Sequence, residues 1–98
     1  MAYNIRALEG FNTDLFAAIE WHLEINPKLA GQLIKEIERT FEIIATHPLS
    51  FQKVYKRTRK VNLIRFPYKI VFEVRKKDVI VIAFAHHKRI PKYWEARK

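Results

Sequence analysis

The hydrophobic pattern of the chain changes its period at His47-Pro48. Before this dipeptide, from about residue 13, apolar side chains recur every three or four positions, which predicts amphipathic helices. After it, apolar residues tend to alternate with polar ones, which predicts β-strands. Because the residue before a proline is disfavoured in the helical region, His47 marks the expected end of the helical part. Helices followed by a run of strands indicate the α+β class.

Two helices are predicted in the first half, after a short strand within residues 2–8. Asn12 or Thr13 is expected to cap the first helix, with Asp14 in its first turn. Asn26-Pro27 should separate the helices, since Asn26 can cap the second one and Pro27 suits its first position. The second helix should run to about Thr46, and so short a connection favours an antiparallel hairpin.

The buried side of each helix is predicted from the spacing of its apolar residues. The expected stripes are Leu15, Ala18, Ile19, His22 and Leu23 in the first helix, and Ala30, Ile34, Ile37, Phe41 and Ile44 in the second. Off the second stripe, and expected in solvent, are Glu36, Glu38, Arg39 and Glu42.

Three further strands are predicted after Pro48. The first contains Val61 and Leu63, and the second places Tyr68, Ile70, Phe72 and Val74 on one side, with Val71 an exception on the other. A turn at residues 76–78 leads to the third, residues 79–85, whose unbroken apolar character is typical of an interior strand. The chain is therefore expected to form one domain, residues 1–98, with the order β-α-α-β-β-β. A helical hairpin should cover one face of a mainly antiparallel sheet, positive charge should gather on the other, and residues 91–97 should add a last helical turn.

Several classes of protein are disfavoured by what the sequence lacks. It has no cysteine, a single serine (Ser50) and no glycine-rich phosphate loop. His22, His47, His86 and His87 have no metal-ligand spacing, so no metal and no cofactor are expected. The longest apolar run, residues 79–85, is too short to cross a membrane, and no signal peptide is recognisable. A cytoplasmic protein without membrane contact is expected.

Charge is divided unevenly along the chain. Residues 1–52 carry a net charge of −3, whereas residues 53–98 carry +12. Such asymmetry predicts an acidic partner, either RNA, DNA or an acidic protein segment. The candidate binding residues are Lys56, Arg57, Arg59, Lys60, His86, Lys88, Lys92 and Trp94.

Metal-free phosphodiester chemistry is one activity that this basic half could support. It needs a base, an acid, and cations near the phosphoryl oxygens. His86 or His87 titrates near neutrality, and Tyr93 is a weaker proton donor. Arg65 and Arg89 can hold phosphoryl oxygens with two parallel hydrogen bonds.

Each candidate also has a purely structural alternative. Either histidine could be a hydrogen-bonded residue at a strand end. Tyr93-Trp94 could form a lid packed on the core. Arg65 could pair with Glu73 on the next strand. The basic residues 53–60 could form a solvated edge that discourages aggregation.

Three segments resemble the RelE/ParE superfamily, the toxins of type II toxin–antitoxin modules. They are Phe66-Pro67-Tyr68-x-Ile70-x-Phe72, Val79-Ile80-Val81-Ile82-Ala83 and His86-x-x-Arg89-x-Pro91-x-Tyr93-Trp94. The resemblance spans nearly the whole chain and implies the same β-α-α-β-β-β order. RelE-like members cleave messenger RNA on the ribosome without a metal, whereas ParE-like members poison DNA gyrase. The last segment is more similar to the ParE-type, plasmid-stabilisation branch.

This resemblance implies a toxin that an acidic cognate antitoxin holds inactive. Ribosome-dependent messenger RNA cleavage, as by an mRNA interferase, is slightly favoured over gyrase inhibition, and a non-toxic RNA-binding module is a further alternative. The residues that would match phosphate-binding and proton-transfer groups are Arg65, His87, Arg89 and Tyr93.

Overall fold

The computed structural model describes residues 2–88 and 94–97. Its elements are, in order, β1 (Asn4–Ala7), α1 (Glu9–Ile25), α2 (Pro27–Thr46), the 3-10 turn η1 (Pro48–Ser50), β2 (Lys53–Tyr55), β3 (Thr58–Asn62), β4 (Tyr68–Arg75), β5 (Asp78–His86) and the 3-10 turn η2 (Glu95–Arg97). The predicted α+β class and the succession of elements are confirmed, with one strand more than expected.

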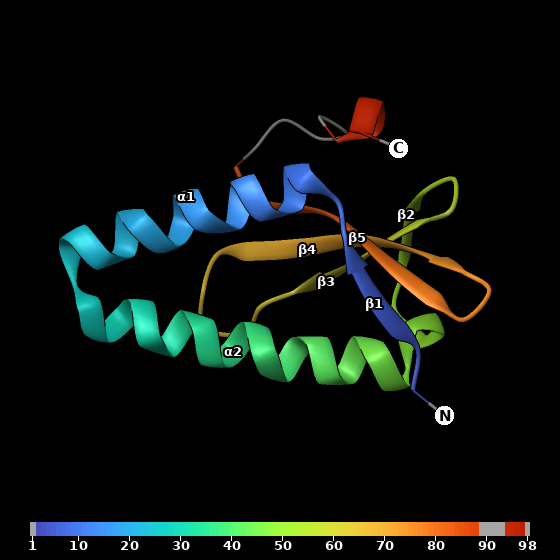
Figure 1. Cartoon of the computed structure of the whole chain (residues 1–98), viewed down its shortest axis with the longest axis horizontal. Coiled ribbons are helices and arrows are strands. Elements are labelled where there is room, and N and C mark those ends of the chain that lie inside the picture. Colours follow the sequence, from blue (N-terminus) through green and yellow to red (C-terminus); the bar gives the residue numbers. More distant parts are fainter. Residues whose placement is uncertain (1, 89–93, 98) are drawn as a thin grey trace.

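A five-stranded sheet in the order β1-β5-β4-β3-β2 carries the helical hairpin on one face (Figure 1). β1 runs parallel to β5, and the other neighbours are antiparallel. The apolar strand β5 lies between β1 and β4, so the predicted interior strand is confirmed.

The strand that the sequence did not predict is β2. The basic segment before Thr58 folds back on itself, with Lys56 in the left-handed region at φ 50°, and β2 pairs with β3. Leu63, in contrast, was wrongly placed in a strand. β3 ends at Asn62, so Leu63 is the first residue of the loop of residues 63–67. Its N–H donates to the carbonyl of Tyr68, the first residue of β4.

The predicted start of the first helix is wrong by several residues. α1 begins at Glu9 with Leu8 in the capping position, and the Thr13 hydroxyl donates to the Glu9 carbonyl inside the helix. The Leu8 N–H donates to Val81 of β5, so a contact with the sheet determines where the helix starts.

The boundaries of the second helix are as predicted. α2 begins at Pro27, the Asn26 side chain accepts the Lys28 N–H, and the helix ends at Thr46 before His47-Pro48. Its buried side is shifted, however, because Leu33 is fully buried while Ile34 is 40% exposed. In α1, Leu23 is likewise exposed rather than buried.

Apolar side chains pack on both faces of the sheet. The main core lies between the helices and the sheet and includes Phe11, Leu33, Ile70 and Phe72. A second, smaller core on the opposite face consists of Val71, Ile82, Ala83 and Trp94, with Leu8 and Ile80 packed against it. A β-bulge in the β4–β5 pairing lets the consecutive residues Ile82 and Ala83 both join this second core. The face opposite the helices is therefore only partly cationic.

Arg97, near the C-terminal end of the described chain, binds to Asp14 of α1 and to β5. The Arg97 guanidinium donates to both carboxylate oxygens of Asp14, at 2.7 and 3.2 Å, and to the Ile82 carbonyl at 3.2 Å. Asp14 also accepts the Phe84 N–H. The pairing of β1 with β5 ends at Val81, so Asp14 and Arg97 satisfy backbone groups of β5 beyond that point. Asp14 thus has this role instead of the predicted place in a first helical turn.

Candidate functional site

The ends of β3, β4 and β5 meet at one end of the sheet. Asn62 pairs with Lys69, Tyr68 pairs with His86, and the His87 N–H donates to the Pro67 carbonyl at 2.9 Å. The strand ends therefore come together as the sequence indicated.

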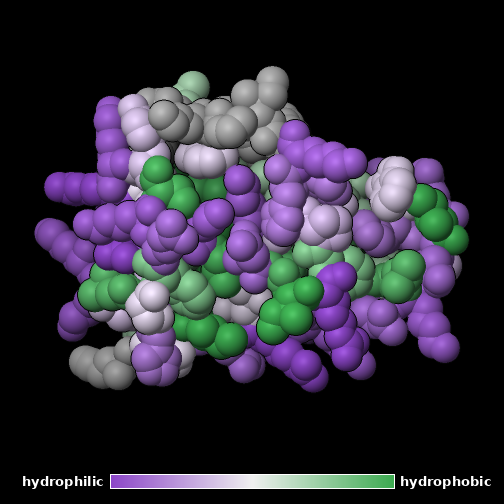
Figure 2. Space-filling model, turned by 180° about the vertical axis from the view of Figure 1, so that it is seen from behind, coloured by the Kyte–Doolittle hydropathy of each residue, from purple (hydrophilic) through white to green (hydrophobic). Residues whose placement is uncertain are grey.

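A small polar hollow of about 150 Å³ lies at these strand ends, lined by Lys60, Asn62, Lys69 and His87. We call it the sheet-face hollow. Val61 and Tyr68, which alternate with its lining residues, pack against the main core. Because successive strand residues point to opposite faces, the hollow is on the face away from the helices. Figure 2 shows the molecule from behind, where hydrophilic side chains spread over much of the surface.

Two ammonium groups share this hollow. Burial and, secondly, the nearby Lys60 charge hold the pKa of Lys69 below its ordinary value of 10.5. The Lys69 Nζ also lies 5.6 Å from the centre of the Trp94 ring. An anion bound here would offset the repulsion between the two lysines, so the hollow suits a phosphate group.

Of the lining residues, Lys60 and His87 were predicted from the sequence, whereas Asn62 and Lys69 were not. The alternation of side chains along a strand could have indicated them. It places Lys60, Asn62 and Lys69 on one face of the sheet, opposite to the face that carries Val61 and Tyr68.

His86 lies on the other face of β5, as expected for neighbouring residues of a strand. It borders a larger hollow of about 690 Å³ between α1 and the sheet, together with Trp21, His22 and Tyr68. Its Nδ1 accepts the Lys88 N–H at 3.1 Å, and its ring stands edge-on to Tyr68. Burial raises the pKa of Tyr68 in this environment. His86 thus matches the alternative of a hydrogen-bonded residue at a strand end.

Arg65 lies in the loop of residues 63–67, where its N–H donates to the Glu36 carboxylate of α2. It lines a third hollow, shared with α2, and not the sheet-face hollow. The alternative pairing of Arg65 with Glu73 is wrong, because Glu73 pairs with Arg75 at 2.7 Å. Glu36 was expected in solvent and is instead half-buried against this loop.

The basic residues of β2 and β3 serve different purposes. The Arg59 guanidinium donates to the carbonyls of Leu49 and Phe51, at 3.3 and 2.6 Å, and so anchors the segment after η1. One guanidinium nitrogen of Arg59 is thus used for backbone bonds, and Arg59 does not line the sheet-face hollow. Lys56 and Arg57 are exposed in the β2–β3 turn, where the Lys56 Nζ lies 5.2 Å from the Tyr55 ring centre.

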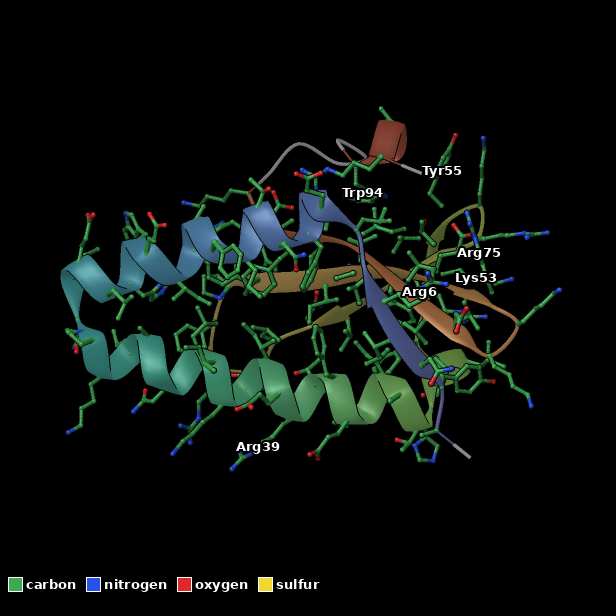
Figure 3. All side chains as sticks on the ribbon, viewed as in Figure 1. Arg6, Arg39, Lys53, Tyr55, Arg75 and Trp94 are labelled. Atoms are coloured by element: carbon green, nitrogen blue, oxygen red, sulfur yellow. The ribbon has the colours of Figure 1, made fainter. Side chains whose placement is uncertain are left out.

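Trp94 is 3% exposed and belongs to the second core. Figure 3 shows it beneath η2. The burial favours the packed-lid alternative over a stacking platform, because a base could reach little of the ring. The exposed Lys88 is described, but the predicted site residues Arg89, Lys92 and Tyr93 lie outside the described residues.

No described helix is both long and apolar enough to cross a membrane. Nor do residues 2–88 and 94–97 gather three or more histidine, cysteine or acidic side chains in a group that could hold a metal ion.

Comparison with known families gives one decisive match. The family model of the ParE toxin of the type II toxin–antitoxin system parDE matches residues 5–91. The chain belongs to the ParE toxin family. Curated protein sequences show no significant match.

Solved structures agree with this ParE-family assignment at the level of the fold. The chromosomal ParDE toxin–antitoxin system from P. aeruginosa aligns with TM-score 0.75 and 16% identity, covering 87% of this chain and 96% of that one. The toxin–antitoxin complex RelBE2 from Mycobacterium tuberculosis aligns with TM-score 0.60 and 15% identity, over 88% and 99% of the two chains. A mutant of the E. coli toxin RelE in the free state aligns with TM-score 0.58 and 16% identity, over 99% and 94%.

These findings confirm the resemblance to the RelE/ParE superfamily and its fold. The ParE-family chain is a type II toxin of the ParE/RelE superfamily. Two of the similar structures are toxin–antitoxin systems.

Proposed function

We propose that this ParE-family toxin arrests growth in the cytoplasm by metal-free, ribosome-dependent cleavage of messenger RNA. The observation that supports this proposal is the sheet-face hollow, in which one imidazole and two ammonium groups converge on an open sheet face. This set combines an imidazole, which can accept a proton, with positive charge for phosphoryl oxygens.

In the proposed reaction, His87 takes the proton of a ribose 2′-hydroxyl. The 2′-oxygen then forms a bond to phosphorus, and the bond from phosphorus to the 5′-oxygen breaks. Tyr93 returns a proton to the leaving oxygen and Arg89 binds phosphoryl oxygens, roles that follow the family resemblance. Arg65 takes no part in this step, because it lines the hollow beside α2. Lys60 and Lys69 stabilise the negative charge that develops on the phosphate.

The imidazole of His87 can be tested by His87→Gln. We expect it to lower messenger RNA cleavage in a translation extract by about 100-fold or more, because an amide cannot take up the proton. The matched control is His47→Gln, an exposed histidine just after α2, which should keep cleavage within about twofold of wild type. Wild-type cleavage by His87→Gln would contradict the proposed base.

A second candidate is poisoning of DNA gyrase, and the match to the ParE family model favours it. Here the cationic end of the sheet would contact gyrase or its DNA, and no catalytic histidine would be needed. Arg89→Ala should lower either activity, whereas His87→Gln should affect only RNA cleavage.

The two candidates are separated by comparing a gyrase supercoiling assay with a translation extract, each with added toxin. Cleaved DNA complexes with intact messenger RNA would reject RNA cleavage. Growth arrest that the neighbouring gene product relieves is expected in both cases. Harmless expression of verified folded protein would contradict both and favour a non-toxic RNA-binding module.

A further inference from the structure

An almost fully exposed isoleucine marks the surface between α2 and the loop of residues 63–67. Ile64 is 94% exposed, although Leu63 and Phe66 of the same loop are buried in the main core. Ile43 of α2, 52% exposed, lines the same hollow of about 240 Å³. Two aliphatic side chains are thus presented to solvent in one place.

The loop that presents Ile64 is fastened to the helix. The Glu36 carboxylate accepts the N–H groups of both Ile64 and Arg65. Charge-assisted bonds of this kind hold backbone groups firmly. Because the loop conformation is already held in this way, a partner that contacts Ile64 would lose little entropy in ordering it.

Cationic side chains surround the two isoleucines. Lys35, Arg39 and Arg65 line the hollow, and none of the three forms an ion pair with another residue in the described part of the chain. Figure 3 shows Arg39 pointing outward from α2. Glu36, the acidic residue among the lining residues, has its carboxylate occupied by the loop. The surface is therefore apolar at its centre and positively charged around it.

We propose that this surface, formed by Lys35, Arg39, Ile43, Ile64 and Arg65, docks an acidic, amphipathic segment of the cognate antitoxin. The inference rests on the proposed toxin function and specifies where its partner binds. Apolar residues of the segment cover Ile43 and Ile64, and its carboxylates pair with Lys35, Arg39 and Arg65. Such a combination of a buried apolar centre and charge complementarity provides both affinity and fast association.

Other occupants fit this surface less well. A second copy of the chain would bring a net charge of +9 toward a cationic surface. RNA would find no aromatic ring among the lining residues on which to stack an unpaired base. An acidic peptide satisfies both the charge and the aliphatic side chains.

Two variants test the docking surface, with antitoxin affinity measured by calorimetry on the full-length proteins. Lys35→Gln combined with Arg39→Gln should weaken binding about tenfold or more, and the loss should shrink at high salt. Ile64→Ala should weaken binding about fivefold or more, with little effect on folding because Ile64 contributes almost nothing to the core. The control for charge, Lys76→Gln with Lys77→Gln in the β4–β5 turn, should bind within about twofold of wild type.

Growth arrest by each variant without antitoxin is the second readout, and it should equal that of wild type. Wild-type antitoxin affinity in both surface variants would overturn the docking surface while leaving the proposed function intact. If the surface variants lost growth arrest but bound the antitoxin as tightly as wild type, the docking surface would also be overturned. The surface would then bind the target of the toxin and not the antitoxin. A wild-type chain that neither arrests growth nor binds the antitoxin would overturn the proposed function together with this inference.

Discussion

The contact between Gly10 and Arg97 shows how one residue can determine where a distant segment lies. A Cβ atom at Gly10 would come within 2.6 Å of the Arg97 Nε and 2.7 Å of its Cζ. The guanidinium is held there by Asp14 and the Ile82 carbonyl, so it has little freedom to move away. At Gly31 of α2, in contrast, an added Cβ would meet nothing within 4 Å.

These two helical glycines should therefore respond oppositely to alanine. Gly31→Ala should raise the free energy of unfolding by about 0.5–1 kcal/mol through helix propensity. Gly10→Ala should lower it by about 1 kcal/mol, because the overlap with Arg97 outweighs the same gain in propensity. Urea unfolding measures both. In an Arg97→Ala background, Gly10→Ala should become stabilising, and persistent destabilisation there would contradict the proposed overlap.

At the scale of elements, the pairing of β3 with β4 brings two lysines to one face of the sheet. Lys60 and Lys69 both line the sheet-face hollow, and the pKa of Lys69 is lowered by burial and by Lys60. Below the lowered pKa, Lys69 is charged in both the folded and the unfolded chain. Between that value and 10.5 the unfolded chain binds more protons, so the contribution of Lys69 to stability rises with pH across this window.

The cause of the shift can be tested at the level of this strand pair. Lys60→Gln should raise the pKa of Lys69 toward 10.5 without fully restoring it, because burial remains. The pKa is followed by NMR titration of the Lys69 side chain. Lys77→Gln, in the turn beyond β4, should leave the pKa of Lys69 unchanged. If the two variants behaved alike, the attribution to Lys60 would be wrong.

For the whole molecule, the second core joins segments from both ends of the chain. Trp94 packs with Val71, Ile82 and Ala83, and Leu8 from the link between β1 and α1 packs against the same group. Arg97 and Asp14 form an ion pair between η2 and α1. The last described residues thus cover apolar surface on the sheet that would otherwise face water.

Removing the Trp94 side chain should therefore destabilise the whole fold. We expect Trp94→Ala to lower the free energy of unfolding by about 3–5 kcal/mol, measured by urea unfolding. Trp21→Ala is the matched control, since Trp21 is 58% exposed, and it should cost under about 1 kcal/mol. Wild-type stability of Trp94→Ala together with lost RNA binding would favour base stacking instead.

The features that could be predicted from the sequence depend on neighbours in the chain. Asn26-Pro27 and His47-Pro48 bound α2 because capping and proline sterics act within a few residues. The apolar run of residues 79–85 identified an interior strand. Lys60 and His87 of the candidate site were recognised from residue type and from the alternation along strands.

The features that were missed depend on contacts between residues far apart in the sequence. The bonds of the Arg59 guanidinium to backbone carbonyls near η1 were not predicted, because they join segments that are separated by a turn. Lys69 lies in the candidate site because β4 pairs with β3, a contact that the sequence pattern did not indicate.

Both helices, four of the five strands and the half of the chain that carries the positive charge could thus be predicted from the sequence, because side-chain period, capping and charge are local properties. The extra strand β2, and the choice of which cations share a hollow and which bond elsewhere, came from the folded arrangement. Long-range packing and hydrogen bonding choose those partners, and the spacing of residues along the chain does not encode them in a readable form.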